Sequence, residues 1–110
     1  MAGTVYVLEE FDQNAGTATG YYKVGMTESE DYGKRLGDLQ TGNPRPLVPV
    51  RAERARDMRT AETEAQKAVG KLPSVTRQVI KDRETEWFHL PLTSKGAFLA
   101  KFDSVIKRYQ

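Results

Sequence analysis

The sequence predicts an α/β (α+β) fold in which a small, mostly antiparallel three-stranded sheet is flanked by helices. Three observations lead to this prediction. The chain has 110 residues, a length that suits a single domain (1–110) with one hydrophobic core. Short runs of β-branched and aromatic residues alternate with longer amphipathic runs. No internal repeat, low-complexity tract or linker separates these runs.

The three strands of the predicted sheet come from the first half of the chain. Thr4–Leu8 and Tyr21–Met26 are rich in β-branched and aromatic residues. Asp12–Gly20, between them, contains two glycines and an asparagine, so we expect a loop longer than a tight hairpin turn. Pro46–Glu53 forms the third strand. Pro49 favours an edge position for it, because proline cannot donate a hydrogen bond to a neighbouring strand.

The first helix is expected between the second and third strands. Thr27-Glu28-Ser29-Glu30 has the spacing of a capping box. Apolar residues from Tyr32 to Leu39 then repeat on one helical face. Gly42 stands where a left-handed C-terminal cap belongs, and Pro44 stops the helix.

The second half of the chain contains two further predicted helices. Apolar and small residues repeat at three- and four-residue spacing from Met58 to Leu72, with Asp57 as the cap. Ser74–Thr85 is mixed and basic, so we expect a loop. Trp87–Leu90 is expected to be a short buried strand. A last helix, capped by Thr93 or Ser94, has an inner face made of Phe98, Phe102, Val105, Ile106 and Tyr109.

Composition is typical of a soluble globular domain, with 38% apolar and 29% charged residues. The absence of cysteine excludes disulfides and thiolate metal sites and suits a reducing interior. One histidine, His89, cannot form a zinc site without cysteine. No apolar run approaches a membrane span and no signal-peptide segment precedes the first strand, so we expect a cytoplasmic protein without membrane contact.

Basic residues cluster in two stretches, although the net charge is only +2. One stretch contains Arg45, Arg51, Arg54, Arg56 and Arg59, and the other contains Arg77, Lys81 and Arg83. Each is either a solvated charged face or a surface that contacts phosphates. The candidate nucleic-acid contacts are Arg51, Arg54, Arg77, Lys81 and Arg83.

Two candidate catalytic side chains lie on the first two strands. Tyr6 alternates with Val5 and Val7, and Lys23 alternates with Val24 and a tyrosine, so Tyr6 and Lys23 share a face if the valines share a core. Without further information they are a half-buried tyrosine and an exposed lysine.

Two more candidates lie on the predicted helices. Arg35 stands beside the inward stripe of the first helix, and Glu62 borders the stripe of the second. Glu64 lies on the opposite flank, so spacing alone does not choose between the two glutamates.

Six motifs occur in order: Val5-Tyr6-Val7, Lys23-Val24-Gly25, Gly33-Lys34-Arg35-Leu36, Leu39-Gln40-Thr41-Gly42-Asn43-Pro44, Glu62 and Glu86-Trp87-Phe88. This set resembles the GIY-YIG nuclease family, in particular its short branch found in phages, plasmids and some microbial genomes. In that branch the second strand reads YxKIG, and a Leu-Gln-Thr-Gly-Asn-Pro turn follows an arginine-bearing helix. The resemblance runs from about Gly3 to Leu90.

The resemblance implies a role for each candidate. Tyr6 borders the attacking water, and Lys23 replaces a tyrosine of the literal motif. A lysine loses its proton more readily when it is desolvated or near another cation, so Lys23 is the candidate general base. Arg35 holds the scissile phosphate. Glu62 is the metal ligand, for Mg²⁺ or Mn²⁺. Gln66 stands where many relatives carry a histidine.

Together these roles predict a metal-dependent DNA endonuclease. The alternative is a nucleic-acid-binding or regulatory module that keeps the fold and cleaves slowly or not at all. The sequence does not distinguish DNA from RNA as the partner. No recognition helix, zinc finger or base-reading motif is visible, so we expect a homodimer or a partner protein to supply specificity.

Overall fold

Five antiparallel strands form one sheet in the order β3-β1-β2-β5-β4 in the computed structural model, which describes residues 1–28 and 31–110. The strands are β1 (Gly3–Asp12), β2 (Thr17–Thr27), β3 (Leu47–Ala55), β4 (Thr76–Ile80) and β5 (Arg83–His89). The predicted α+β class is confirmed. The prediction of three strands is wrong, because the sheet continues past β2 into a second hairpin.

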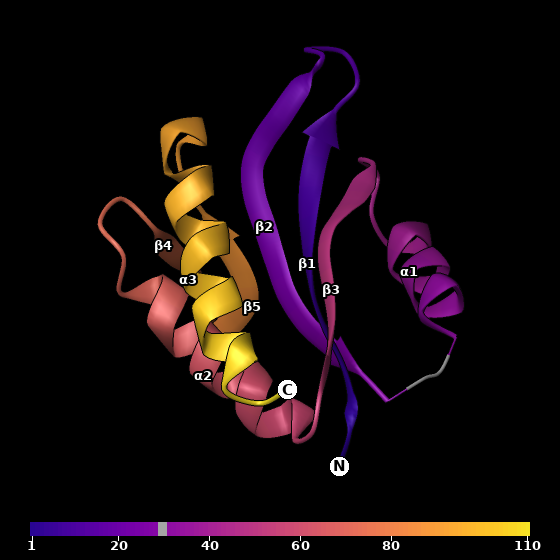
Figure 1. Ribbon diagram of the computed structural model, residues 1–110. Coiled ribbons are helices and arrows are strands. Elements are labelled where there is room, and N and C mark those ends of the chain that lie inside the picture. The colour runs from indigo at the N-terminus through magenta and orange to yellow at the C-terminus, as the bar shows by residue number, and fades with distance from the viewer. Residues whose placement is uncertain (29–30) are drawn as a thin grey trace.

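Helices cover both faces of this sheet. Figure 1 shows α1 (Tyr32–Thr41) alone on one face and α2 (Met58–Gly70) with α3 (Lys95–Lys107) on the other. A short 3₁₀ turn, η1 (Leu92–Ser94), leads into α3. Within the described residues, no helix combines the length and the apolar character needed to cross a membrane.

The larger apolar core lies between the sheet and the helix pair α2–α3. Val5, Val7 and Val24 are fully buried there. Ala61 and Ala65 of α2 are also fully buried, and these small side chains let the helix approach the strands closely. Asp57 caps α2 as predicted, because its side chain accepts a hydrogen bond from the Thr60 amide.

The smaller core lies under α1. Tyr6, Leu8 and Leu47 are buried on that face of the sheet. Partly buried side chains pack against them: Tyr32, Leu36, Leu39 and Trp87. The two cores therefore separate the valine face of β1 and β2 from the face that carries Tyr6.

The segment 74–85, predicted as a loop, forms β4, the tight turn of a hairpin and the start of β5. Lys81 and Asp82 form this turn, and both have positive φ angles, 51° and 63°. Two such residues match a type I′ turn, which joins antiparallel strands tightly. The prediction failed because neither residue is the glycine that usually marks this turn.

Smaller corrections concern the ends of elements. The predicted loop Asp12–Gly20 shrinks to residues 13–16, since β1 and β2 continue into it. Asp31, not Thr27, caps α1, and part of the predicted capping box lies at residues 29–30, outside the described chain. Gly42 has φ −86° and is not a left-handed cap.

One feature of the edge was predicted correctly. Pro49 lies in β3, which is an edge strand, and the register between β1 and β3 shifts beside it. At the edge of a sheet, a proline need not cost a hydrogen bond between strands, because one side of the strand has no neighbour.

Candidate active site

Tyr6 and Lys23 lie on the same face of the sheet. In the register of β1 and β2, Tyr6 is opposite Gly25 and Leu8 is opposite Lys23. Directly opposed residues in antiparallel strands point to the same side, so the predicted shared face is confirmed. Tyr6 is only 2% exposed, so it is more buried than the half-buried side chain that alternation alone suggests.

Gly25 explains where the phenol lies. A Cβ atom at this position would meet Cζ and Oη of Tyr6 at 2.6 Å, closer than real Cβ contacts. The ring of Tyr6 therefore lies directly over the backbone of β2. Only glycine allows this close approach, which gives the last residue of the Lys23-Val24-Gly25 motif a physical reason.

The helix α1 brings a guanidinium and a second phenol to Tyr6. Burial raises the pKa of Tyr6, and the adjacent Arg35 guanidinium opposes that rise. The ring of Tyr32 stacks on that of Tyr6, with centroids 5.8 Å apart. The Tyr32 hydroxyl is buried and has no hydrogen-bond partner among the described residues.

The side chain of Lys23, on β2, contacts two residues of the neighbouring strand β5. Its Nζ atom lies 3.5 Å from Oε2 of Glu86 and 5.9 Å from the centre of the Trp87 ring. The side chain of Lys23 is only 15% exposed. Glu86, which the sequence indicated only as the first residue of the last motif, is therefore the direct partner of the candidate base.

Glu62 is a buried carboxylate on α2, the helix that lies on the face of the sheet opposite α1. It is 8% exposed, and its Oε2 atom has no hydrogen-bond partner among the described residues. Burial raises the pKa of Glu62 from an ordinary 4.5 to about 7, and the negative charge of Glu86 adds to this rise. Arg59, Arg77 and Lys23 act in the opposite direction.

The structure also separates Glu62 from Glu64. Glu64 points to the surface and pairs with Lys67 at 3.9 Å. An unpaired buried oxygen is costly, so the orphaned Oε2 of Glu62 suits an additional ligand, whereas Glu64 has its partner.

The donors near Glu62 fit a hard divalent cation with few protein ligands. No group of three or more His, Cys, Asp or Glu residues is arranged to hold a metal in the part of the chain that the structure describes. Mg²⁺ commonly binds through one or two carboxylates, with water and substrate phosphate completing its shell. Glu62, with Glu86 close enough to alter its pKa, meets that requirement.

Gln66 links α2 to the β4–β5 hairpin. Its Nε2 donates to the carbonyl of Val24 at 2.9 Å, and its Oε1 accepts from Nη2 of Arg77 at 2.9 Å. Arg77 also donates to the carbonyl of Thr85 at 2.7 Å. The resemblance drew attention to Gln66, one turn after Glu62, but nothing in the sequence indicated its hydrogen bond with Arg77.

The candidate nucleic-acid contacts therefore differ in their surroundings. Arg77 is 18% exposed and bound within the protein, whereas Lys81 and Arg83 are exposed at the hairpin turn. Arg51 donates two hydrogen bonds to the carboxylate of Asp103 on α3. It lies on the face of the sheet opposite Tyr6. Arg54 is exposed and lies on the Tyr6 face.

Comparison of the chain with protein-family models, curated proteins and solved structures found no match. The resemblance to the GIY-YIG family therefore remains a prediction from ordered motifs.

Proposed function

We propose that this protein is a metal-dependent endonuclease that hydrolyses phosphodiester bonds in DNA. The observation that supports this most is the buried carboxylate of Glu62, whose Oε2 atom has no hydrogen-bond partner among the described residues and whose charge acts on Tyr6 and Lys23. Arg35, from a fourth element, lies beside the phenol. The four groups come from β1, β2, α1 and α2. A phenol, an ammonium, a guanidinium and a carboxylate are the groups that such a hydrolysis needs.

Each side chain has a proposed task. Glu62 holds Mg²⁺ or Mn²⁺, which supplies Lewis-acid stabilisation of charge on phosphate oxygens. Arg35 binds the scissile phosphate through parallel hydrogen bonds. The hydroxyl of Tyr6 orients the attacking water, and the amine of Lys23 accepts its proton. The phenol of Tyr6 is held over Gly25, so it does not have to be ordered when substrate binds.

The test of this function is direct. Purified protein is incubated with duplex DNA, single-stranded DNA and RNA, with Mg²⁺, with Mn²⁺ and with chelator, and the products are resolved on a denaturing gel. Cation-dependent cleavage of DNA supports the endonuclease. Cleavage that persists in chelator removes the metal assignment, and preferential cleavage of RNA changes the substrate.

One observation favours the alternative, a nucleic-acid-binding module. The amine of the proposed base lies in an ion pair with Glu86. A protein that binds DNA but does not cleave it with either cation is such a module.

The first prediction concerns Arg35. We expect Arg35→Ala to lower kcat about a hundred- to a thousandfold, the usual effect of losing one donor to a developing oxyanion. DNA affinity should change little, because this contact strengthens as charge develops in the transition state. Single-turnover kinetics and equilibrium binding measure the two effects. Lys34→Ala, the adjacent exposed cation of α1, is the control. Equal losses in rate and affinity would make Arg35 a phosphate anchor.

The second prediction concerns the hairpin turn. Lys81→Gln with Arg83→Gln should weaken binding to all DNA sequences alike and reduce the slope of log K against log salt by up to about two. These side chains are exposed, and Arg77 is left in place because it is bound within the protein. Fluorescence anisotropy over a salt series measures the slope. An unchanged slope places the binding surface elsewhere, with Arg54 as the next candidate.

A further inference from the structure

The Leu39–Pro44 turn, which the proposed chemistry leaves unexplained, has a dense set of hydrogen bonds. Gln40, in the last turn of α1, uses both ends of its amide. Its Oε1 accepts from the Leu47 amide at 2.7 Å, and its Nε2 donates to the carbonyls of Asn43 and Arg45 at 3.2 and 3.0 Å. One side chain therefore ties the end of α1 to the first residue of β3.

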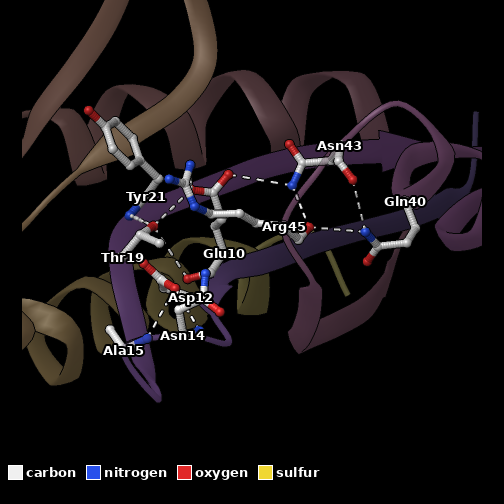
Figure 2. Close-up of polar contacts among 9 residues, drawn as sticks. All are labelled: Glu10, Asp12, Asn14, Ala15, Thr19, Tyr21, Gln40, Asn43 and Arg45. Carbon is white, nitrogen blue, oxygen red and sulfur yellow. Dashed lines mark hydrogen bonds and ion pairs between the residues drawn. The ribbon is translucent and has the colours of Figure 1, made fainter.

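Asn43 extends this connection to β1. Its Nδ2 donates to the Arg45 carbonyl at 2.6 Å and to Oε2 of Glu10 at 3.4 Å. The other carboxylate oxygen of Glu10 accepts from the Thr19 hydroxyl at 3.0 Å. Figure 2 shows Gln40, Asn43 and Glu10 in this continuous set of contacts. We refer to these three residues as the clamp.

The clamp matters because α1 is otherwise lightly packed. None of the ten residues of α1, all of them described, is buried, whereas six residues of α2 are. Only partly buried side chains of α1 rest on the small core. A helix with little buried surface depends on its end contacts for its position.

Arg35 and the clamp residue Gln40 lie on the same helix, so a shift of α1 at the clamp would also move Arg35. Arg35 precedes Gln40 by five residues, about 7.5 Å along a helix. A tilt of about 10° around the clamp would therefore move Arg35 by roughly 1 Å. Misplacement of that size can cost about a hundredfold in rate.

We infer that Glu10, Gln40 and Asn43 are positioning residues. They hold α1 in place against the sheet and so keep Arg35 beside the phenol of Tyr6. The inference about catalysis rests on the proposed nuclease function. The inference about the seat of α1 does not, because it follows from hydrogen bonds and burial alone.

The experiment combines kinetics with two structural readouts. Gln40→Ala removes three hydrogen bonds while keeping a good helix former, and Asn43→Ala is a second, milder break. Trp87 is the only tryptophan and packs against the same core as α1, so its fluorescence reports on this packing. Hydrogen exchange of the α1 amides reports on the helix itself. Far-UV circular dichroism establishes that each variant is folded.

We expect Gln40→Ala to lower kcat about 10- to 100-fold with KM changed less than about threefold. Trp87 emission should move to longer wavelength, and α1 amides should exchange faster. Glu10→Ala should behave similarly. Glu10→Gln should keep most of the parent activity, because the amide oxygen of the new glutamine still accepts a hydrogen bond from Asn43. Asp12→Ala is the matched control, since Asp12 accepts hydrogen bonds from the backbone amides of Asn14 and Ala15 in the neighbouring turn, and Figure 2 draws no contact between it and Gln40.

Two results would overturn the inference. One is parent-like emission and exchange in the folded Gln40→Ala protein. The other is a loss of kcat in the clamp variants without change in either readout, which would place these side chains in contact with substrate. If the parent cleaves no nucleic acid but Gln40→Ala shifts emission and exchange, the proposed function fails and the seating role stands.

Discussion

Glu62→Gln is expected to abolish cleavage and, at pH 8, to make the fold more stable than the parent. Loss of the only buried, unpartnered carboxylate oxygen found among the described residues removes the proposed metal ligand. Lewis-acid stabilisation contributes several kcal/mol to such reactions, so the rate should fall at least about a thousandfold. A residue that served only the fold would not combine lost activity with gained stability.

The gain in stability follows from the raised pKa of Glu62. In the unfolded chain this carboxyl titrates near 4.5, and in the native protein near 7. Protonation therefore favours the folded state, and the ionised form costs stability that appears as pH rises from 4.5 to 7. The full cost is present above pH 7 and is on the order of 3 kcal/mol. Neutral glutamine avoids that cost.

Thermal unfolding at two pH values measures this effect. At pH 8 the Tm of Glu62→Gln should exceed that of the parent by several degrees, and at pH 4 the difference should vanish because the parent carboxyl is then protonated. Mg²⁺ at pH 8 should raise the Tm of the parent and leave that of Glu62→Gln unchanged. Glu64→Gln, two residues away and paired with Lys67, is the control. A lower Tm for Glu62→Gln at pH 8 would contradict the burial argument.

The part of the site on β1 and β2 was predictable because strand alternation is a local rule. Valines at positions 5, 7 and 24 define one face, which leaves Tyr6 and Lys23 on the other. The helix α2 was predictable for a similar reason, since its apolar residues repeat at helical spacing and Asp57 precedes them. These patterns need no knowledge of distant contacts.

What was missed depends on contacts between segments far apart in the chain. Nothing near Arg77 in the sequence indicates that its guanidinium binds Gln66, eleven residues earlier. The pair of Lys23 and Glu86 likewise exists only because β5 lies beside β2. The hairpin containing Lys81 and Asp82 was missed because two non-glycine residues adopt positive φ angles there. Long-range pairing, rather than local preference, determines these features.

Lys23→Met and Lys23→Arg together are expected to distinguish a proton acceptor from a simple positive charge. A lysine amine accepts a proton once it is neutral, whereas arginine stays protonated in proteins and cannot serve as a base. Arginine nevertheless keeps the charge that faces Glu86. If Lys23 is the base, both variants should lose at least about a hundredfold in kcat, within the usual range for general base catalysis. DNA affinity should stay close to that of the parent.

The pH dependence of the rate completes the test of Lys23. A base that must lose its proton gives a rate that rises with pH, so measurements start at pH 7.5, where Glu62 with its pKa of about 7 is already mostly ionised. The rise above this pH should be present in the parent and absent from the residual activity of Lys23→Arg. Full activity in Lys23→Arg, with loss only in Lys23→Met, would show that Lys23 acts through its charge. Parent-like cleavage by Lys23→Met would remove it from the mechanism and leave the phenol of Tyr6 as the group that orders the attacking water.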